Sequence, residues 1–205
     1  MAVHGAGVSD VEHEDLGQGA RVELHRELPV AGAMDRLLAE LPLAEESYRM
    51  GGWTVKAPRL VAFHGDPGTG YVYSGLHHEP SPWTPTLGEL RERVQETTGL
   101  TFNAVLANLY RQGSDSMGWH ADAEPEIGPA PADRWVASLS LGAARRFVLK
   151  HRKTGERRVY ELGEGDLLVM RGTTQTHWRH ALPKTKKPVG PRLNLTFRHI
   201  VQLPR

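Results

Sequence analysis

The sequence predicts a mainly β (α+β) protein, with an antiparallel β core and helices from the N-terminal half packed against it. Two observations carry this prediction. Two stretches in the first hundred residues have apolar side chains at helical spacing. After Gly99, short apolar segments alternate with turn residues, a pattern typical of a β-sandwich or barrel. A chain of 205 residues, 39% hydrophobic, is long enough for one core.

The N-terminal half supplies the helices. Residues 1–20 are polar, glycine-rich and acidic, so we expect a flexible tail there and a single domain over 21–205. A first helix is expected over about 31–41. A second is expected over about 87–98, with Thr86 and Glu89 forming a capping box at its start.

Short strands account for most of the remaining chain. Turn signals such as GSD, EPEIGPAPAD, TG and GEG separate them. The expected strands are 60–65, 70–75, 102–110, 134–142, 145–151, 157–162, 166–172 and 192–200.

Composition limits the chemistry. The chain has no cysteine, which excludes disulfides, thiolate metal sites and cysteine nucleophiles, so any metal must bind nitrogen and oxygen ligands. No apolar run approaches the length of a membrane span, and the N-terminus does not resemble a secretory signal. We therefore expect a cytoplasmic protein, nucleoid-associated in a bacterium, that binds no membrane and acts as a monomer.

Charge is distributed unevenly along the chain. Residues 1–142 contain 10 Lys/Arg and 20 Asp/Glu, whereas residues 143–205 contain 15 and 4. One interpretation is a polyanionic partner such as nucleic acid. The alternative is that the two halves neutralise each other in the fold.

The stretch GWHADAE suggests a metal site. His120 and Asp122 are two positions apart, so in a strand their side chains share a face. His177 or His180, just after the apolar segment DLLVM, offers a third ligand, and spacing does not decide between them. Two histidines and one carboxylate form the facial triad of non-haem Fe(II) oxygenases.

The last expected strand has one polar face. Its apolar residues alternate with Arg192, Asn194, Thr196 and Arg198. Two arginines six positions apart lie roughly 20 Å apart at their Cα atoms, and their long side chains narrow that gap. This polar face is either exposed to solvent or lines a cavity, where paired arginines suit a dicarboxylate.

Four segments in order resemble the AlkB family of Fe(II)- and 2-oxoglutarate-dependent dioxygenases. They are FNAVLANLYRQGSDSMGWHADAEPE, SLSLGAARRFVLKH, GDLLVMRGTTQTHWRHALP and PRLNLTFR, and the resemblance covers about residues 48–200. It implies a double-stranded β-helix (jelly-roll) core over about 100–200 and a nucleotide-recognition lid over about 45–85. It also implies oxidative demethylation of alkylated bases with Fe(II), 2-oxoglutarate and O2.

The resemblance assigns roles to individual residues. His120, Asp122 and His180 become the iron ligands and catalytic centre, because the family's third ligand precedes an apolar-proline segment like ALP. The expected cosubstrate-binding residues are Arg192 and Arg198, as partners of its carboxylates, with Asn108, Tyr110, Asn194 and Thr196.

The same resemblance identifies residues for the substrate base. Tyr73 and His120 are expected to enclose the flipped base, and Glu124 to contact its exocyclic nitrogen. Met50 matches the position of a wedge that fills the gap left by the base, although members that prefer duplexes have a bulkier aromatic there, and the alternative is a packing role.

The basic hairpin and a second basic loop are expected to contact the nucleic-acid backbone. These residues are Lys150, Arg152, Lys153, Arg157, Lys184, Lys186 and Lys187. The expected function is direct-reversal repair of 1-methyladenine and 3-methylcytosine in single- or double-stranded DNA, releasing formaldehyde and succinate. The alternatives are the same iron chemistry on RNA or on a protein side chain, and a catalytically silent nucleic-acid-binding β domain.

Overall fold

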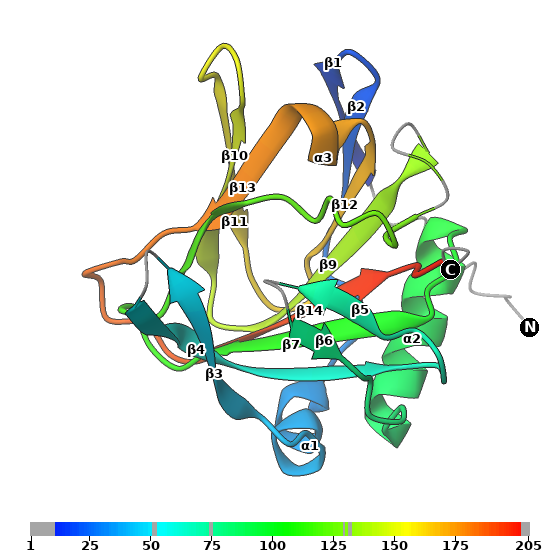
Figure 1. The fold of residues 1–205 in the computed structure, drawn as a ribbon, viewed down its shortest axis with the longest axis vertical. Helices are drawn as coiled ribbons and strands as arrows, with labels where there is room; N and C mark the ends of the chain where they lie inside the picture. Colours follow the sequence, from blue (N-terminus) through cyan, green and yellow to red (C-terminus); the bar gives the residue numbers. More distant parts are fainter. Residues whose placement is uncertain (1–10, 51–52, 74–75, 129, 131–132, 202–205) are drawn as a thin grey trace, which may run out of the picture.

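The structure is a computed structural model that describes residues 11–50, 53–73, 76–128, 130 and 133–201. Among these residues the strands form two large antiparallel sheets and one small hairpin (Figure 1). The larger sheet contains, in spatial order, β1 (Val11–Gly17), β2 (Ala20–His25), β12 (Leu167–Gly172), β9 (Trp135–Gly142), β14 (Arg192–Arg198), β7 (Ala104–Tyr110), β4 (Trp53–Gly65) and β3 (Ala44–Met50).

The smaller sheet faces the middle of the larger one. Its spatial order is β11 (Arg157–Leu162), β10 (Arg145–His151), β13 (Trp178–Leu182) and β8 (Met117–His120). The separate hairpin consists of β5 (Tyr71–Tyr73) and β6 (Leu76–His78). The helices are α1 (Ala33–Glu40), α2 (Pro85–Thr98) and the short α3 (Thr174–His177). This two-sheet arrangement confirms the expected jelly-roll core.

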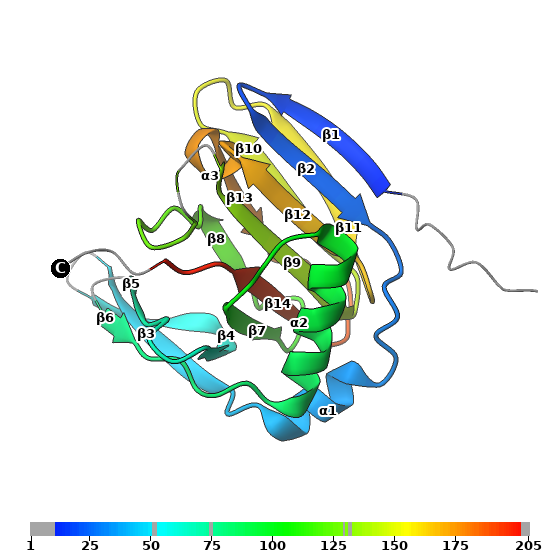
Figure 2. The ribbon, with the colours of Figure 1, turned by 90° about the vertical axis from the view of Figure 1, so that its right-hand side faces the viewer.

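Two hydrophobic cores lie on opposite faces of the larger sheet. Leu37 of α1 and Leu90 of α2 pack against one face, which both helices cover (Figure 2). On the other face, Leu149 and Trp178 of the smaller sheet pack against Leu168 of β12. The second core fills only one end of the space between the sheets, because β14 presents polar residues at the other end.

Strand β14 has an apolar face toward the helices and a polar face toward the smaller sheet. It lies between β9 and β7, so its backbone is paired on both sides. Leu193, Leu195 and Phe197 belong to the core under the helices. The alternate residues face the smaller sheet, and all seven residues of the strand are buried. The polar face therefore lines the space between the sheets, which answers the question that alternation left open.

The N-terminal segment differs from the expected tail. Residues 11–20 belong to a hairpin in which β1 pairs with β2, and only residues 1–10 lie outside the described residues. The acidic side chains that predict disorder have partners far away in the sequence. Glu14 accepts bonds from Arg158 and Tyr160, and Arg26 pairs with Glu12. Burial of one face and these ion pairs offset the ordering entropy.

Helix α2 also begins differently from the expectation. Thr84 is its N-cap and accepts a hydrogen bond from Leu87 N, with proline at the first helical position. Thr86 instead bonds Glu40, and Glu89 pairs with Arg36. The expected capping box is therefore wrong, because both of its members bind residues of the neighbouring helix α1.

Several elements were not predicted. Strands β1, β2, β3, β6, β8 and β13 and helix α3 have no counterpart among the expected elements, and β4 is longer than the expected 60–65. Strands β8 and β13 are short and carry histidines, so they lack an apolar strand pattern. The expected lid over 45–85 contains β3 to β6, and its role stays a prediction. Within the described chain, no helix has the length and hydrophobicity needed to span a membrane.

Candidate metal and cosubstrate site

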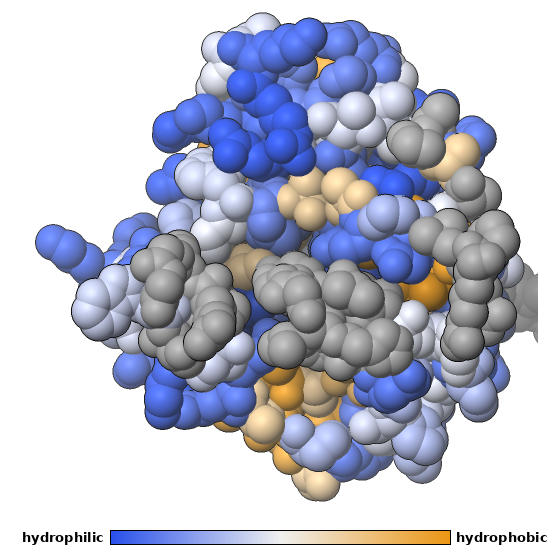
Figure 3. Space-filling view, in the orientation of Figure 1, coloured by the Kyte–Doolittle hydropathy of each residue, from blue (hydrophilic) through white to orange (hydrophobic). Residues whose placement is uncertain are grey.

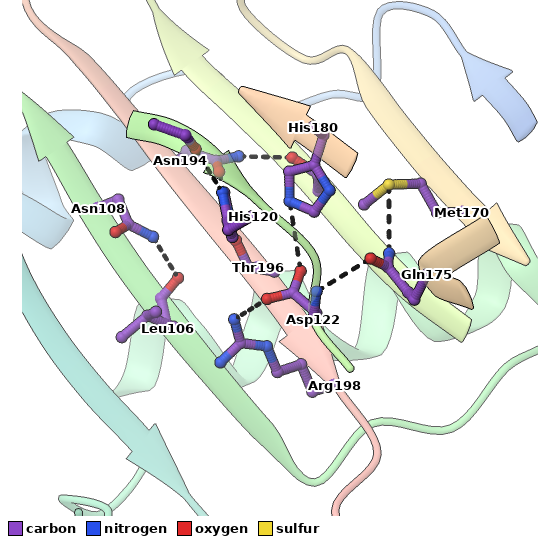
Figure 4. A network of polar contacts seen from close by, with 12 residues as sticks. Leu106, Asn108, His120, Asp122, Met170, Gln175, His180, Asn194, Thr196 and Arg198 are labelled. Atoms are coloured by element: carbon purple, nitrogen blue, oxygen red, sulfur yellow. Dashed lines mark hydrogen bonds and ion pairs between the residues drawn. The ribbon is translucent and has the colours of Figure 1, made fainter. Parts of the chain in front are cut away.

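Three ligand side chains meet between the two sheets. His120 ends β8, Asp122 follows in the next loop, and His180 lies opposite His120 in the pairing of β13 with β8. Their ligand atoms all lie within 4.8 Å of one another. His180 Nε2 is 3.6 Å from Asp122 Oδ2, and the two imidazole centroids are 4.1 Å apart (Figure 4).

His180 is therefore the histidine that joins His120 and Asp122. His177, the alternative from spacing, lies in α3, and its ring faces His151 at 6.4 Å between centroids. Among the described residues, no other group of three or more His, Asp or Glu side chains is arranged to hold a metal ion.

The electrostatics of the site favour metal binding. Burial raises the pKa of Asp122, but the Arg198 guanidinium and the imidazole of His180 outweigh it, so the pKa falls to about 2. Burial, with the neighbouring His120, lowers the pKa of His180 to about 3, and burial lowers that of His120 as well. Both imidazoles are therefore neutral near pH 7 and Asp122 is ionised, which are the forms that bind metals.

Neighbouring groups orient these ligands. His120 Nδ1 lies 2.8 Å from the Gly118 carbonyl and donates to it, which leaves Nε2 as the basic nitrogen. The backbone N–H of Asp122 donates to Gln175 Oε1 at 3.0 Å, and Gln175 Nε2 donates to Met170 Sδ at 3.4 Å. Two neutral imidazoles and one ionised carboxylate within reach of one point fit a divalent metal such as Fe(II).

A cavity of about 250 Å³ adjoins the three ligands. All six residues expected to bind the cosubstrate line it. They are Asn108, Tyr110, Arg192, Asn194, Thr196 and Arg198. The cavity is thus large enough for one small organic acid beside a metal ion, and the buried Arg192 in its lining suits a carboxylate.

Arg192 lies in this cavity with most of its donors available. It is 1% exposed and donates to Ser140 Oγ at 2.8 Å. Its Nε is buried and has no hydrogen-bond partner among the described residues. Burial lowers its pKa to about 10, so the guanidinium remains charged at neutral pH. A buried charge with unused donors is costly unless a carboxylate ligand completes it.

Arg198 already has a partner within the protein. Its Nη2 donates to Asp122 Oδ1 at 2.6 Å. The sequence predicts that both arginines bind cosubstrate carboxylates, and the structure adds a second role for Arg198 as an ion-pair partner of Asp122. The two guanidiniums occupy opposite ends of the polar face of β14, six residues apart.

The remaining polar residues of the cavity are held by neighbours. Asn194 Nδ2 donates to Ser138 Oγ at 2.8 Å and to the Leu139 carbonyl at 2.9 Å. Asn108 Oδ1 accepts from Arg59 Nε at 2.7 Å. These contacts fix the amides before a ligand arrives, so little side-chain entropy remains to be lost on binding.

Some residues of the site were not identified from the sequence. Ser138 and Ser140 alternate with leucines in SLSLG, the same period-two signal that marks β14, so this signal was available. Arg59 and Gln175 lie in segments without any comparable pattern. Phe147, whose ring stacks on His180 at 5.2 Å between centroids, resembles any core aromatic in the sequence.

Glu124 lies in the loop after the metal ligands. Arg134 Nη2 donates to the Glu124 carbonyl at 3.2 Å, which helps to fix the loop backbone. Burial and the nearby charge of Asp122 raise the pKa of the Glu124 side chain. Its Oε2 is buried without a hydrogen-bond partner among the described residues, so this oxygen is open to a ligand.

The two lid residues are described only in their backbone. Met50 lies opposite Trp53 where β3 pairs with β4, and Tyr73 lies opposite Leu76 where β5 pairs with β6. Their side chains fall outside the described part of the chain. The expected wedge and the expected stacking on the base stay predictions.

Two groups of basic residues in the C-terminal half bear on the two interpretations of the charge asymmetry. Some neutralise the acidic half, since Arg158 pairs with Glu14 and Arg171 with Glu23. The others are exposed or partly exposed on the smaller sheet and its loops, and hydrophilic residues gather over the β10–β11 end of the molecule (Figure 3). These are Lys150, Arg152, Lys153, Arg157, Lys184, Lys186 and Lys187. The mutual neutralisation of the two halves is therefore confirmed for Arg158 and Arg171, and contact of the exposed cations with a polyanion stays a prediction.

The amino-acid sequence of this chain is similar to those of known oxygenases. Residues 29–198 match the 2OG-Fe(II) oxygenase superfamily. The chain is 45% identical over 152 residues to the DNA oxidative demethylase ALKBH2 of Mus musculus, covering 70% of this chain and 62% of that protein. It is 38% identical over 182 residues to the human alpha-ketoglutarate-dependent dioxygenase alkB homolog 3, covering 84% and 62%. The chain thus spans about three fifths of the length of these mammalian relatives.

Two further similarities extend over more of the chain. The DNA oxidative demethylase ALKBH2 of Arabidopsis thaliana is 34% identical over 218 residues, covering 91% of this chain and 68% of that protein. The solved structure of OsALKBH1 superposes with a TM-score of 0.64 at 19% identity, covering 92% of this chain and 100% of that one. The second similarity supports the fold alone.

Proposed function

Because this chain belongs to the 2OG-Fe(II) oxygenase superfamily, and within it to the AlkB family, we propose that it oxidatively demethylates N-alkylated bases in DNA. The observation that carries the proposal is the His120–Asp122–His180 group, with Asp122 and His180 buried, at a cavity that Arg192 also lines. In this proposal the three side chains hold Fe(II), which supplies the oxidation of the N-methyl group with O2 and 2-oxoglutarate.

Arg192 binds the cosubstrate in this mechanism. Its buried charge and unused Nε favour a carboxylate at the end of the cavity that it lines. Arg198 holds Asp122 ionised and in place, while Asn108, Tyr110, Asn194 and Thr196 line the space between. These contacts exclude water and fix 2-oxoglutarate in one orientation beside the metal ligands.

Glu124 selects the base. Burial penalises its carboxylate, so a cationic partner stabilises the ionised form. Adenine methylated at N1 and cytosine methylated at N3 carry a positive charge and an exocyclic amino group, and both features suit an acceptor with a free oxygen. Tyr73 and His120 enclose the flipped base, as the AlkB pattern implies. Hydroxylation of the methyl group gives an N-hydroxymethyl base, which loses formaldehyde and leaves the base restored.

The main alternative is the same chemistry on RNA or on a protein side chain. The exposed cations of the smaller sheet favour a nucleic acid but do not distinguish its sugar. A silent nucleic-acid-binding domain is the second alternative. It gives no reason for three metal-ligand atoms within 4.8 Å of one another.

The test is mass spectrometry of an oligodeoxynucleotide that carries one 1-methyladenine. It is incubated aerobically with the protein, Fe(II), ascorbate and 2-oxoglutarate, and parallel reactions lack 2-oxoglutarate or contain the Asp122→Ala variant. We expect loss of one methyl mass in the complete reaction only. An unchanged DNA with a demethylated RNA of the same sequence would assign the activity to RNA. No change in either, from protein that binds iron, would refute the proposal.

A further inference from the structure

The outer face of the smaller sheet has an apolar groove with two exposed apolar side chains. Val148 of β10 lies between Val159 of β11 and Ala181 of β13 in the strand pairing. Trp119 of β8 borders the same groove, which has a volume of about 380 Å³. Trp119 is 42% exposed and Val159 is 49% exposed. Large side chains exposed together in this way mark an interaction surface.

A row of cations borders this groove. Lys150 lies directly opposite Arg157 on one neighbouring strand and Arg179 on the other, so three positive side chains cross three paired strands. Like charges directly opposite each other destabilise a sheet. Among the described residues no carboxylate forms an ion pair with any of the three. Arg146 and Lys184 also line the groove.

The aromatic ring lies near one of these cations. Lys150 Nζ lies 5.9 Å from the centroid of the Trp119 ring. The groove therefore combines a flat apolar surface with a charged border, which is the arrangement that binds single-stranded nucleic acid. Unpaired bases stack on the aromatic ring while phosphates bind the cations. A duplex presents phosphates but hides the faces of its bases, so it does not use the apolar groove.

The groove and the cavity at the metal site share part of their lining. His120 points to the metal site, and Trp119 precedes it, so the two side chains lie on opposite faces of β8. Met117 and Leu182 line both the cavity and the groove. Strand β8 is the edge of the smaller sheet (Figure 2), so a polymer strand can pass over it from one side to the other.

We propose that this groove binds the single-stranded nucleic acid that flanks the target base. One flanking base stacks on Trp119, and the phosphates beside it contact Lys150, Arg157 and Arg179. The inference rests on the proposed function for the identity of the polymer and extends it with a second binding site. It predicts that affinity depends on the length of single strand beside the target nucleotide.

The test measures binding of unmodified single strands to the 205-residue chain by fluorescence anisotropy. The probes are labelled dT and rU oligomers of about 3 and about 12 nucleotides, each titrated at several salt concentrations. The variants are Trp119→Leu, which keeps an apolar side chain, Trp119→Phe, which keeps a ring, and Lys150→Ala/Arg157→Ala. The control Arg21→Ala removes one exposed cation from the larger sheet.

If one base stacks on Trp119, then Trp119→Leu should raise the Kd of the longer oligomers at least about fivefold. Trp119→Phe should retain most of the affinity, and the short oligomers should bind all of these proteins alike. The double charge variant should lower the slope of log K against log salt by about 1.4, since each phosphate contact on a single strand contributes about 0.7. Arg21→Ala should change neither quantity.

Val159→Glu provides a check that does not touch a metal-ligand strand. It places a negative charge in the apolar groove from β11, so it should weaken binding of the longer oligomers as Trp119→Leu does. The inference is overturned if these variants bind like Arg21→Ala at every salt concentration, or if Trp119→Phe loses as much affinity as Trp119→Leu. A loss in the rU series alone or in the dT series alone supports the groove and identifies its polymer.

Turnover of a short methylated oligomer separates this inference from the proposed function. If the wild type demethylates nothing but binds long single strands more tightly than Trp119→Leu does, the demethylase is refuted and the groove is supported. Demethylation that is unaffected by oligomer length, in the wild type and in Val159→Glu, supports the demethylase and overturns the groove.

Discussion

Replacing Arg192 with methionine tests two effects of this side chain separately. One is the cost of burying its charge in the ligand-free protein, and the other is its contribution to binding the cosubstrate. Arg192 is 1% exposed and makes one side-chain hydrogen bond, to Ser140, with its Nε unpartnered among the described residues. Burial lowers its pKa from 12.5 to about 10. One pKa unit corresponds to about 1.4 kcal/mol, so the charged form costs the folded, ligand-free protein roughly 3 kcal/mol.

The variant Arg192→Met should therefore have opposite effects on stability and binding. Without cosubstrate, its free energy of unfolding should equal that of the wild type or exceed it by up to about 3 kcal/mol, because an apolar side chain replaces an incompletely paired charge. With cosubstrate, an unpaired carboxylate would be buried, which should raise the KM for 2-oxoglutarate at least about a hundredfold. The stabilisation that 2-oxoglutarate gives the wild type should disappear.

Arg145 is the matched control, since it is 3% exposed but makes three hydrogen bonds to backbone carbonyls. Its guanidinium donates to the carbonyls of Gln112, Asp115 and Pro183 at 3.3, 2.9 and 2.8 Å. Arg145→Met should lose at least about 2 kcal/mol of stability through these orphaned carbonyls. The assay is urea unfolding with Mn(II), which prevents turnover, with and without 2-oxoglutarate. A ligand-free Arg192→Met protein that loses as much stability as Arg145→Met, or still gains stability from 2-oxoglutarate, would refute this reasoning.

Three more predictions concern the support of the site and of the fold. Gln175→Leu removes the acceptor for the amide of the metal-ligand aspartate, so Co(II) affinity measured by absorbance should fall about 10- to 100-fold, whereas the exposed Thr176→Ala should retain it. Burial lowers the pKa of His25, so its protonation favours the unfolded chain: stability is full above about pH 6.5 and falls as the pH drops below it. Urea unfolding at pH values between 7.5 and 5 should show a smaller decline of stability with falling pH in His25→Phe than in the wild type. Equal declines in the two proteins would contradict the role given to His25. Gly165 has φ of 78°, and an added Cβ would lie 2.6 Å from a backbone carbonyl, so Gly165→Ala should cost at least about 1 kcal/mol in the same assay.

The sequence predicts the parts of the site that follow a strand period. The alternation in RLNLTFR places Arg192 and Arg198 on one face, and burial of that face follows once β14 is central in the sheet. The pairing of His120 with His180 is different, because it depends on two short strands that spacing along the chain does not reveal. Only the resemblance to a family selected His180 over His177 before the structure did.

Contacts between distant segments explain the main errors. Residues 11–20 are acidic and appear disordered in isolation, and their partners Arg158 and Tyr160 lie about 145 positions later. The N-cap of α2 is Thr84 and not the expected Thr86, because the Thr86 hydroxyl bonds Glu40 of α1. Local propensity is a weak guide wherever such a tertiary partner is available.

The position of β8 at the edge of the smaller sheet gives the metal a mechanical role. This four-residue strand pairs with β13 alone, through Met117 and His120, with an irregular register between His180 and Leu182. A metal held by His120 and His180 would tie this short edge to its neighbour, as a cross-link does. Without the metal, backbone amides of Met117–His120 should exchange with solvent sooner than those of β10. Loss of the metal would then loosen Trp119 together with His120, so it would weaken the groove proposed above as well as the metal site.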